Sequence, residues 1–150
     1  MTTKTEMLRE FYPLTGAKAM ELWPKIFPFI NDALAPANGD LDGRKERIQK
    51  SLLNESLTLW LGLKDKEFNV IITTTENTDP HSGEKSLLIY SMVIQEAISP
   101  VDLRFGLDKL KAYAKSRGLP KVTALTKLDL VRTLFEKAGG STTFTLDLEV

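Results

Sequence analysis

The sequence predicts an α/β fold in which a mixed β-sheet carries helices on both faces, as a three-layer sandwich. The main observation is the stretch Leu87–Ile94, which is apolar on both of its alternating faces. One face carries Leu87, Ile89 and Val93, and the other carries Leu88, Tyr90, Met92 and Ile94. Because such a strand needs cover on both sides, we expect it in the centre of the sheet. The second observation is that helical patterns both precede and follow the strand patterns, so that helices are available for both faces.

The segment before the first long strand predicts two helices. An apolar stripe runs from Thr15 to about Leu34, but Pro24 and Pro28 interrupt it. Since each proline removes an amide donor and crowds the preceding turn, we expect a helix that begins near Pro24 or is kinked. A second, more polar helix is expected over Asp42–Asn54. For residues 1–13 the sequence leaves open a short first strand, a helix or an arm, with Phe11 and Tyr12 on the body of the protein.

Strand and helix patterns alternate through the rest of the chain. Leu57–Leu63 predicts a strand, and the turn at residues 64–66 leads into an antiparallel strand that fades through Thr73–Thr75. Glu76–Lys85 has the turn chemistry of a polar loop. The helix after Leu87–Ile94 is predicted by the spacing of Leu103, Leu107, Leu110 and Ala114. We then expect a strand at Val122–Leu125, a helix at Leu128–Ala138, a last strand at Phe144–Val150, and one domain over residues 1–150.

The composition excludes several classes of function. Lys+Arg and Asp+Glu are both 20 in 150 residues, and each half of the chain has ten of each. Without net charge or asymmetry, sequence-independent binding to nucleic acid or to an anionic membrane is not expected. The chain has no cysteine, which excludes disulfides and thiolate chemistry. With no apolar run of spanning length and no signal-peptide core, the sequence predicts a soluble, intracellular protein.

The turn between the central strand and its helix predicts a closed helix start, which here means one whose backbone amides are missing or already satisfied within the chain. Residues 95–102 contain no glycine, and Pro100 has no amide donor. Ser99 is placed as the N-cap, Pro100 as the first helical residue and Asp102 as an acidic third residue. We expect the Asp102 carboxylate to satisfy the amides at this helix end, which would otherwise attract an anion.

Four segments in this order resemble the GNAT (Gcn5-related N-acetyltransferase) superfamily, over about residues 22–150. They are LWPKIFPFINDAL, LTLWLGL, LKAYAKSRGLPKVTAL and VRTLFEKAGG. Within the superfamily the chain looks most like small GNAT-like proteins of tailed bacteriophages. The resemblance implies a mostly antiparallel mixed sheet with helices on both faces.

Two positions depart from the superfamily's pattern for active members. Their (R/Q)-x-x-G-x-(G/A) loop binds the CoA pyrophosphate, whereas residues 95–102 here lack any glycine. Many active members place a Tyr that protonates the leaving thiolate where this chain has Phe135. The resemblance therefore implies a phage-type GNAT-like protein that is degenerate in catalysis and needs no cofactor. It would bind other proteins, either virion components or a host protein, in the host cytoplasm or the virion, and could form homo-oligomers.

The alternative is a divergent acetyl-CoA-dependent N-acetyltransferase. In that case the resemblance places the pantetheine against the backbone of Met92, Val93 and Ile94, with Arg104 near the phosphates. Glu96 would then deprotonate the acceptor amine, directly or through a water molecule.

Other side chains with chemical potential have simpler interpretations. His81, the only histidine, is predicted to be a solvated loop residue. We interpret Lys109, Lys111 and Lys115, which Asp102 and Asp108 accompany, as a solvated helix face and not as a basic patch. Trp23 and Trp60 lie within apolar patterns and predict core or partner packing. No cluster of carboxylates or histidines has the spacing of metal ligands.

Overall fold

The computed structural model describes residues 10–34, 41–94, 98–124, 129–142 and 148. Five strands and four helices are formed within these residues. The strands are β1 (Glu10–Leu14), β2 (Thr58–Lys64), β3 (Glu67–Thr78), β4 (Lys85–Ile94) and β5 (Lys121–Ala124). The helices are α1 (Gly16–Leu34), α2 (Leu41–Leu53), α3 (Pro100–Ser116) and α4 (Asp129–Lys137).

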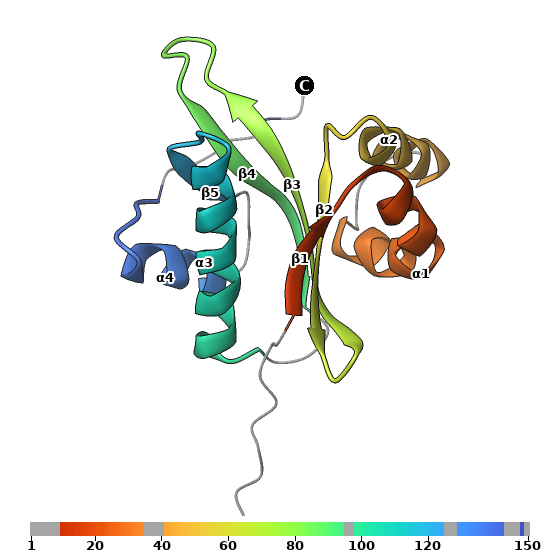
Figure 1. Cartoon of the computed structure of the whole chain (residues 1–150). Helices are drawn as coiled ribbons and strands as arrows, with labels where there is room; N and C mark the ends of the chain where they lie inside the picture. The colour runs from red at the N-terminus through yellow and green to blue at the C-terminus, as the bar shows by residue number, and fades with distance from the viewer. Residues whose placement is uncertain (1–9, 35–40, 95–97, 125–128, 143–147, 149–150) are drawn as a thin grey trace, which may run out of the picture.

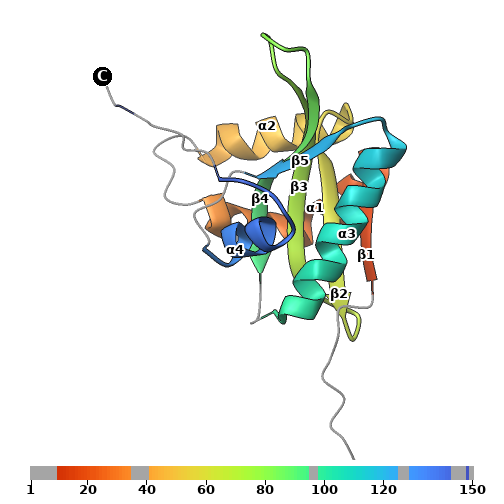
Figure 2. The same ribbon diagram turned by 90° about the vertical axis from the view of Figure 1, so that its left-hand side faces the viewer.

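The strands form one sheet in the order β1-β2-β3-β4-β5. Neighbouring strands are antiparallel except for β4 and β5, which are parallel and joined through α3. Helices α1 and α2 cover one face of the sheet, and α3 and α4 cover the other (Figures 1 and 2). This arrangement confirms the predicted fold class. No helix in the described part of the chain is both long and apolar enough to cross a membrane.

Strand β3, and not β4, occupies the middle of the sheet. Strand β4 lies between β3 and β5, but β5 pairs only with its first part, Ser86–Ile89. β1 supplies the short first strand that the sequence left open, and its Phe11 is buried. The predicted last strand, Phe144–Val150, falls outside the described residues except for Leu148, which is in no strand and is exposed.

The hairpin of β3 and β4 is longer than the sequence predicts and projects beyond the body of the protein (Figure 1). The polar loop expected at Glu76–Lys85 is wrong at both ends, because residues 76–78 pair with residues 85–87. Backbone pairing does not depend on apolar side chains, and the side chains of residues 76–78 are exposed. Periodicity of apolar residues therefore could not detect this extension.

A β-bulge at Tyr90 changes which side chains of β4 share a face. Thr73 pairs with Ser91 and Thr74 pairs with Ile89, so that Tyr90 has no partner on β3. Beyond the bulge the alternation is shifted by one residue. Met92 consequently packs on the same face as Leu87 and Ile89, whereas Val93 packs on the opposite face. The predicted grouping of Val93 with Leu87 and Ile89 is wrong for this reason.

Helix α1 begins well before Pro24 and contains both prolines. The expectation of a helix that begins near Pro24 is wrong. Pro24 and Pro28 are four residues apart and both are exposed, while Ala19, Trp23 and Ile26 form the buried stripe. Carbonyl groups that lose an amide donor near an exposed proline can bind water, which lowers the cost of the interruption.

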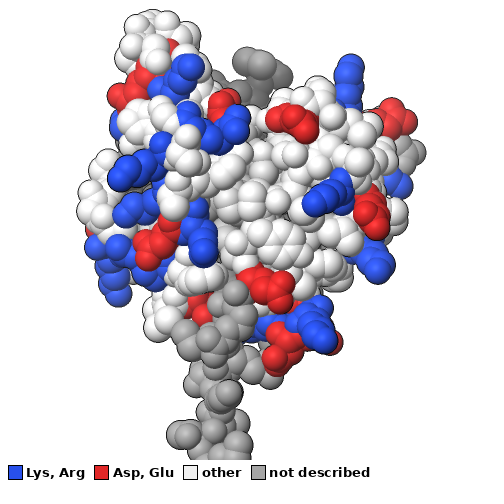
Figure 3. All heavy atoms as spheres, viewed as in Figure 1, with Lys and Arg blue, Asp and Glu red and all other residues white. Residues whose placement is uncertain are grey.

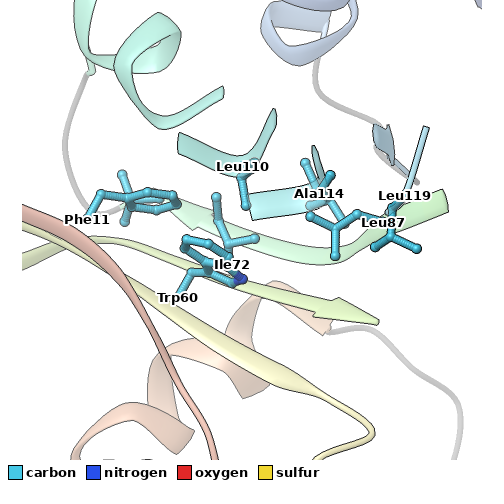
Figure 4. Close-up of a cluster of buried hydrophobic side chains, with 9 residues drawn as sticks. Phe11, Trp60, Ile72, Leu87, Leu110, Ala114 and Leu119 are labelled. Atoms are coloured by element: carbon cyan, nitrogen blue, oxygen red, sulfur yellow. The ribbon is translucent and has the colours of Figure 1, made fainter. Parts of the chain in front are cut away.

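The core between the sheet and α3 is centred on Trp60 (Figure 4). Its ring stacks on Phe11 at a centroid distance of 5.1 Å and meets Tyr113 edge-on at 5.0 Å. The indole Nε1 donates a hydrogen bond of 2.9 Å to Thr74 Oγ1, so the buried nitrogen is satisfied. These contacts join β1, β2, β3 and α3 and hold α3 against the sheet.

Candidate functional site

The junction between β4 and α3 is the first candidate site, because a strand that leads into a helix start is a common place for an anion. Ser99 has φ −72° and ψ 154° and is the N-cap of α3. Its Oγ accepts a hydrogen bond of 3.1 Å from the amide of Asp102, and its carbonyl accepts one of 3.0 Å from the amide of Leu103. The predicted helix start, with Pro100 as the first residue, is confirmed.

This cap leaves few backbone donors for a ligand. Pro100 has no amide N–H, and the amide of Asp102 is occupied by Ser99. Among the first three residues of α3, only Val101 has an amide to which the described residues supply no acceptor. A diphosphate usually binds several converging amides at a helix start, and α3 does not offer them.

Asp102 contributes a buried negative charge to the same helix start. The residue is 1% exposed, and its carboxylate forms an ion pair of 3.3 Å with Lys64 Nζ at the end of β2. The sequence predicts only the interaction of this carboxylate with the helix end. The ion pair is a non-local interaction that connects β2 to the first turn of α3.

The predicted cofactor-binding residues on β4 lie at the open part of that strand. Ile89 is the last residue of β4 that pairs with β5, so the β5-side edge of residues 90–94 has no strand partner among the described residues. Met92, Val93 and Ile94 are half-buried. The side chain of Met92 packs toward α3 and that of Val93 toward α1, which leaves the backbone edge for an extended ligand.

The other two predicted site residues are Glu96 and Arg104. Glu96 lies outside the described residues, so its predicted role as a base stays a prediction. Arg104 is 48% exposed and forms an ion pair of 3.2 Å with Asp108 one turn further along α3. In the described structure its charge is therefore matched by a carboxylate on its own helix.

Phe135 of α4 is half-buried and packs against the core beneath α3. Together with Met92, Ile98 and Leu103 it lines a cavity of about 30 Å³ between the sheet, α3 and α4. A volume of that size holds about one water molecule and no pantetheine arm. The side chain of Phe135 also has no group that could transfer a proton at this place.

Metal chemistry has no site in the described residues. They contain no group of three or more His, Asp or Glu side chains that could hold a metal ion. His81 lies at the exposed tip of the β3–β4 hairpin, as the sequence predicts. There the carboxylate of Asp79 accepts hydrogen bonds from the amides of His81 and Ser82, which lower the pKa of Asp79.

A groove between the second half of α3, β5 and the end of α4 was not predicted from the sequence. Its volume is about 730 Å³. Three lysines line it, Lys111 and Lys115 from α3 and Lys121 from β5. The lysine spacing on α3 was visible in the sequence, but their position opposite β5 and α4 is a property of the fold.

Several solved structures similar to this chain are described as acetyltransferases. One is a predicted acetyltransferase from Clostridium acetobutylicum with acetyl-CoA, at 19% identity and a TM-score of 0.70, covering 93% of this chain and 95% of that chain. Another is an aminoglycoside N-acetyltransferase in complex with CoA, at 10% identity and a TM-score of 0.68, covering 100% and 98%. A GNAT family acetyltransferase from Staphylococcus aureus matches at 14% identity and a TM-score of 0.62, covering 93% and 97%.

Sequence comparison adds no closer relative. No protein-family model matches the chain, and no curated protein is detectably similar to it. The similarity to solved structures extends over nearly the whole chain and includes the mixed sheet and the helices on both of its faces. The chain therefore has the fold of the GNAT acetyltransferases.

Proposed function

We propose that this chain is a GNAT-fold protein of the tailed-phage type that has little or no acyltransferase activity and acts by binding another protein. The partner would be a virion component or a host protein, in the virion or the host cytoplasm. The phage association rests on the resemblance of the sequence. The observation that supports the loss of acyltransferase activity is the closed start of α3.

The closed helix start argues against CoA binding on two physical grounds. Ser99 and Pro100 together remove amide donors that would hold a pyrophosphate. The buried carboxylate of Asp102 occupies the positive end of the helix dipole, where a phosphate group would otherwise gain most. Lys64 offsets part of that negative charge, but as the partner of Asp102 it is not a free cation for a ligand.

The region beneath α3 supports the same conclusion. Phe135 has no group that could protonate a leaving thiolate. An acetyltransferase reaction would therefore need a different acid. Loss of catalysis leaves the fold free to serve as a binding surface, since fold alone does not dictate function.

A divergent acetyl-CoA-dependent N-acetyltransferase is the second candidate. The observation in its favour is the edge of β4 beyond Ile89, which no described residue pairs and to which an extended ligand could add as a strand. The similar structures with acetyl-CoA or CoA bound are consistent with such a ligand. This function would use the backbone of Met92–Ile94, Glu96 as the base, and Arg104 after release from Asp108.

Calorimetric titration of the whole chain with acetyl-CoA and with CoA tests the proposal. We expect no saturable heat at ligand concentrations up to about 1 mM. A dissociation constant below about 100 μM would contradict the proposal and favour the enzyme. In that event Ile94→Pro and Arg104→Gln should weaken binding. Arg132→Gln is the matched control, because Arg132 is a similarly exposed arginine in an ion pair within its own helix, α4.

A further inference from the structure

The groove at the end of α3 combines an apolar floor with a basic rim. It lies in the layer of α3 and α4 that faces the viewer in Figure 2. Its floor is formed mainly by apolar side chains, which include Leu107, Leu119, Val122 and Phe135. None of the described residues that line it is acidic.

Lys111 and Lys115 give the rim a charge that the described residues do not neutralise. They stand four residues apart on α3, so their like charges repel each other. Neither forms an ion pair within the described residues. Lys121 is the third lysine of the rim and forms an ion pair of 2.6 Å with Glu84.

All three α3 lysines are exposed, as the sequence predicts, but the two aspartates that accompany them do not balance Lys111 and Lys115. Asp102, which was expected to balance them, is buried at the other end of α3, and Asp108 pairs with Arg104. Residues 98–124 and 129–142 contain eight basic and four acidic side chains, although the whole chain is neutral. Figure 3 shows the resulting concentration of Lys and Arg over the part of the surface formed by α3 and α4.

We propose that this groove binds an acidic, amphipathic segment of a partner protein. The floor would accept apolar side chains of the segment, and its carboxylates would reach Lys111 and Lys115. A nucleic acid is less suited to the floor, where Phe135 is the one aromatic ring among the lining residues described. The inference rests on the proposed protein-binding function and names the chemistry of the partner.

The groove is separate from the start of α3. Along the helix axis, Lys111 lies about 14–17 Å and Lys115 about 20–23 Å from residues 100–102. A ligand at either end of α3 can therefore be tested without removing the residues of the other site.

Fluorescence anisotropy with designed peptides tests the inference on the whole chain. The probe is a labelled amphipathic peptide of about 12 residues with an apolar stripe and glutamates beside it. Two companion peptides replace the glutamates by glutamine or by lysine. We expect the acidic peptide to bind, the glutamine peptide to bind at least about tenfold more weakly, and the lysine peptide not to bind.

Three variants assign that binding to the groove. Lys111→Gln with Lys115→Gln should weaken the acidic peptide about tenfold, and Ala112→Glu should do so by adding a carboxylate at an exposed position of the lining. Lys25→Gln with Lys50→Gln is the matched control, since it removes the same charge from α1 and α2 and should leave binding unchanged. Circular dichroism verifies that all variants fold.

Several results would overturn the inference. They are the absence of acidic-peptide binding at about 1 mM, equal binding of the three peptides, or equal losses in the groove and control variants. Tighter binding of an oligothymidylate of the same charge would indicate a nucleic-acid surface instead. A shorter chain that ends at residue 142 and binds the peptide far more tightly would show that the groove serves the protein's own C-terminal residues.

The outcome is distinguishable from that of the proposed function. Acetyl-CoA is titrated into the same groove variants, which leave Ser99–Asp102 intact. If CoA binds tightly and the acidic peptide still binds at the groove, the proposed loss of catalysis is rejected but the proposed role of the groove is retained. If neither acetyl-CoA nor the acidic peptide binds, the proposed role of the groove is rejected, while the proposed loss of CoA binding at the start of α3 remains supported.

Discussion

Gly106 offers a sharp test of the packing beneath α3. It lies in the interior of the helix and is buried, yet a Cβ added there would meet no atom within 4 Å. Gly106 also lines the cavity of about 30 Å³ between α3 and the sheet. Gly106→Ala should therefore increase the stability of the protein without a steric penalty.

The expected size of the effect follows from two contributions. Alanine is favoured over glycine in a helix interior by about 1 kcal/mol. Burial of one methyl group adds at most about 0.8 kcal/mol. The free energy of unfolding should thus rise by about 1–2 kcal/mol, and the melting temperature by about 3–6 °C.

Gly118→Ala is the matched control for this prediction. A Cβ at Gly118 would also meet no atom within 4 Å, but the residue has φ of +71°. Because L-residues are disfavoured in that conformation, Gly118→Ala should lower the free energy of unfolding by about 1 kcal/mol. Urea denaturation measures both variants. A neutral or destabilising Gly106→Ala with an unchanged m-value would refute the space assigned beneath α3.

Three further predictions concern buried and turn interactions. Lys64→Met removes one ion-pair partner of the buried Asp102 carboxylate and should lower the free energy of unfolding by about 2–4 kcal/mol in urea denaturation. Trp60→Phe leaves the buried Thr74 hydroxyl without its donor and should cost about 1–3 kcal/mol by the same measurement. Because the pKa of Asp79 is lowered, its ionised carboxylate stabilises the hairpin at pH values above the ordinary pKa of 3.8. This stabilisation is lost as the pH falls through the lower pKa that Asp79 has in the folded protein. A midpoint below 3.8 in an NMR titration of Asp79 is the expected result.

Each of these predictions has an outcome that would contradict it. A Lys64→Met variant as stable as the original protein would mean that the Asp102 carboxylate does not depend on Lys64. Equal stability of Trp60→Phe would show that the hydrogen bond to Thr74 contributes nothing net. An Asp79 midpoint at or above 3.8 would mean that the amides of His81 and Ser82 do not hold the ionised carboxylate.

Regular periodicity accounts for the part of the fold that the sequence predicted. The alternation in Leu57–Leu63 and the helical spacing of Leu103, Leu107 and Leu110 reflect burial of one face against the core, which any correct fold must provide. The cap at Ser99 was predictable because capping is a local interaction of four residues.

The errors arise where one extra residue or a distant partner decides the structure. The bulge at Tyr90 breaks the alternation of β4 without any signal from glycine or proline. Pro24 and Pro28 were weighted as helix breakers because their exposure could not be known. The Lys64–Asp102 ion pair joins residues 38 positions apart, so only the tertiary structure reveals it.

The order of the strands in the sheet has a consequence for the synthesis of the chain on the ribosome. Strands β2, β3 and β4 are consecutive in both sequence and space, so this meander can pair as soon as residue 94 has emerged. Strand β1 emerges earlier but must wait for β2 until both α1 and α2 have passed. The face that receives α3 stays open longest, because its cover is translated last. Nascent chains should therefore be most vulnerable to aggregation through Trp60 and its neighbours until α3 folds over them.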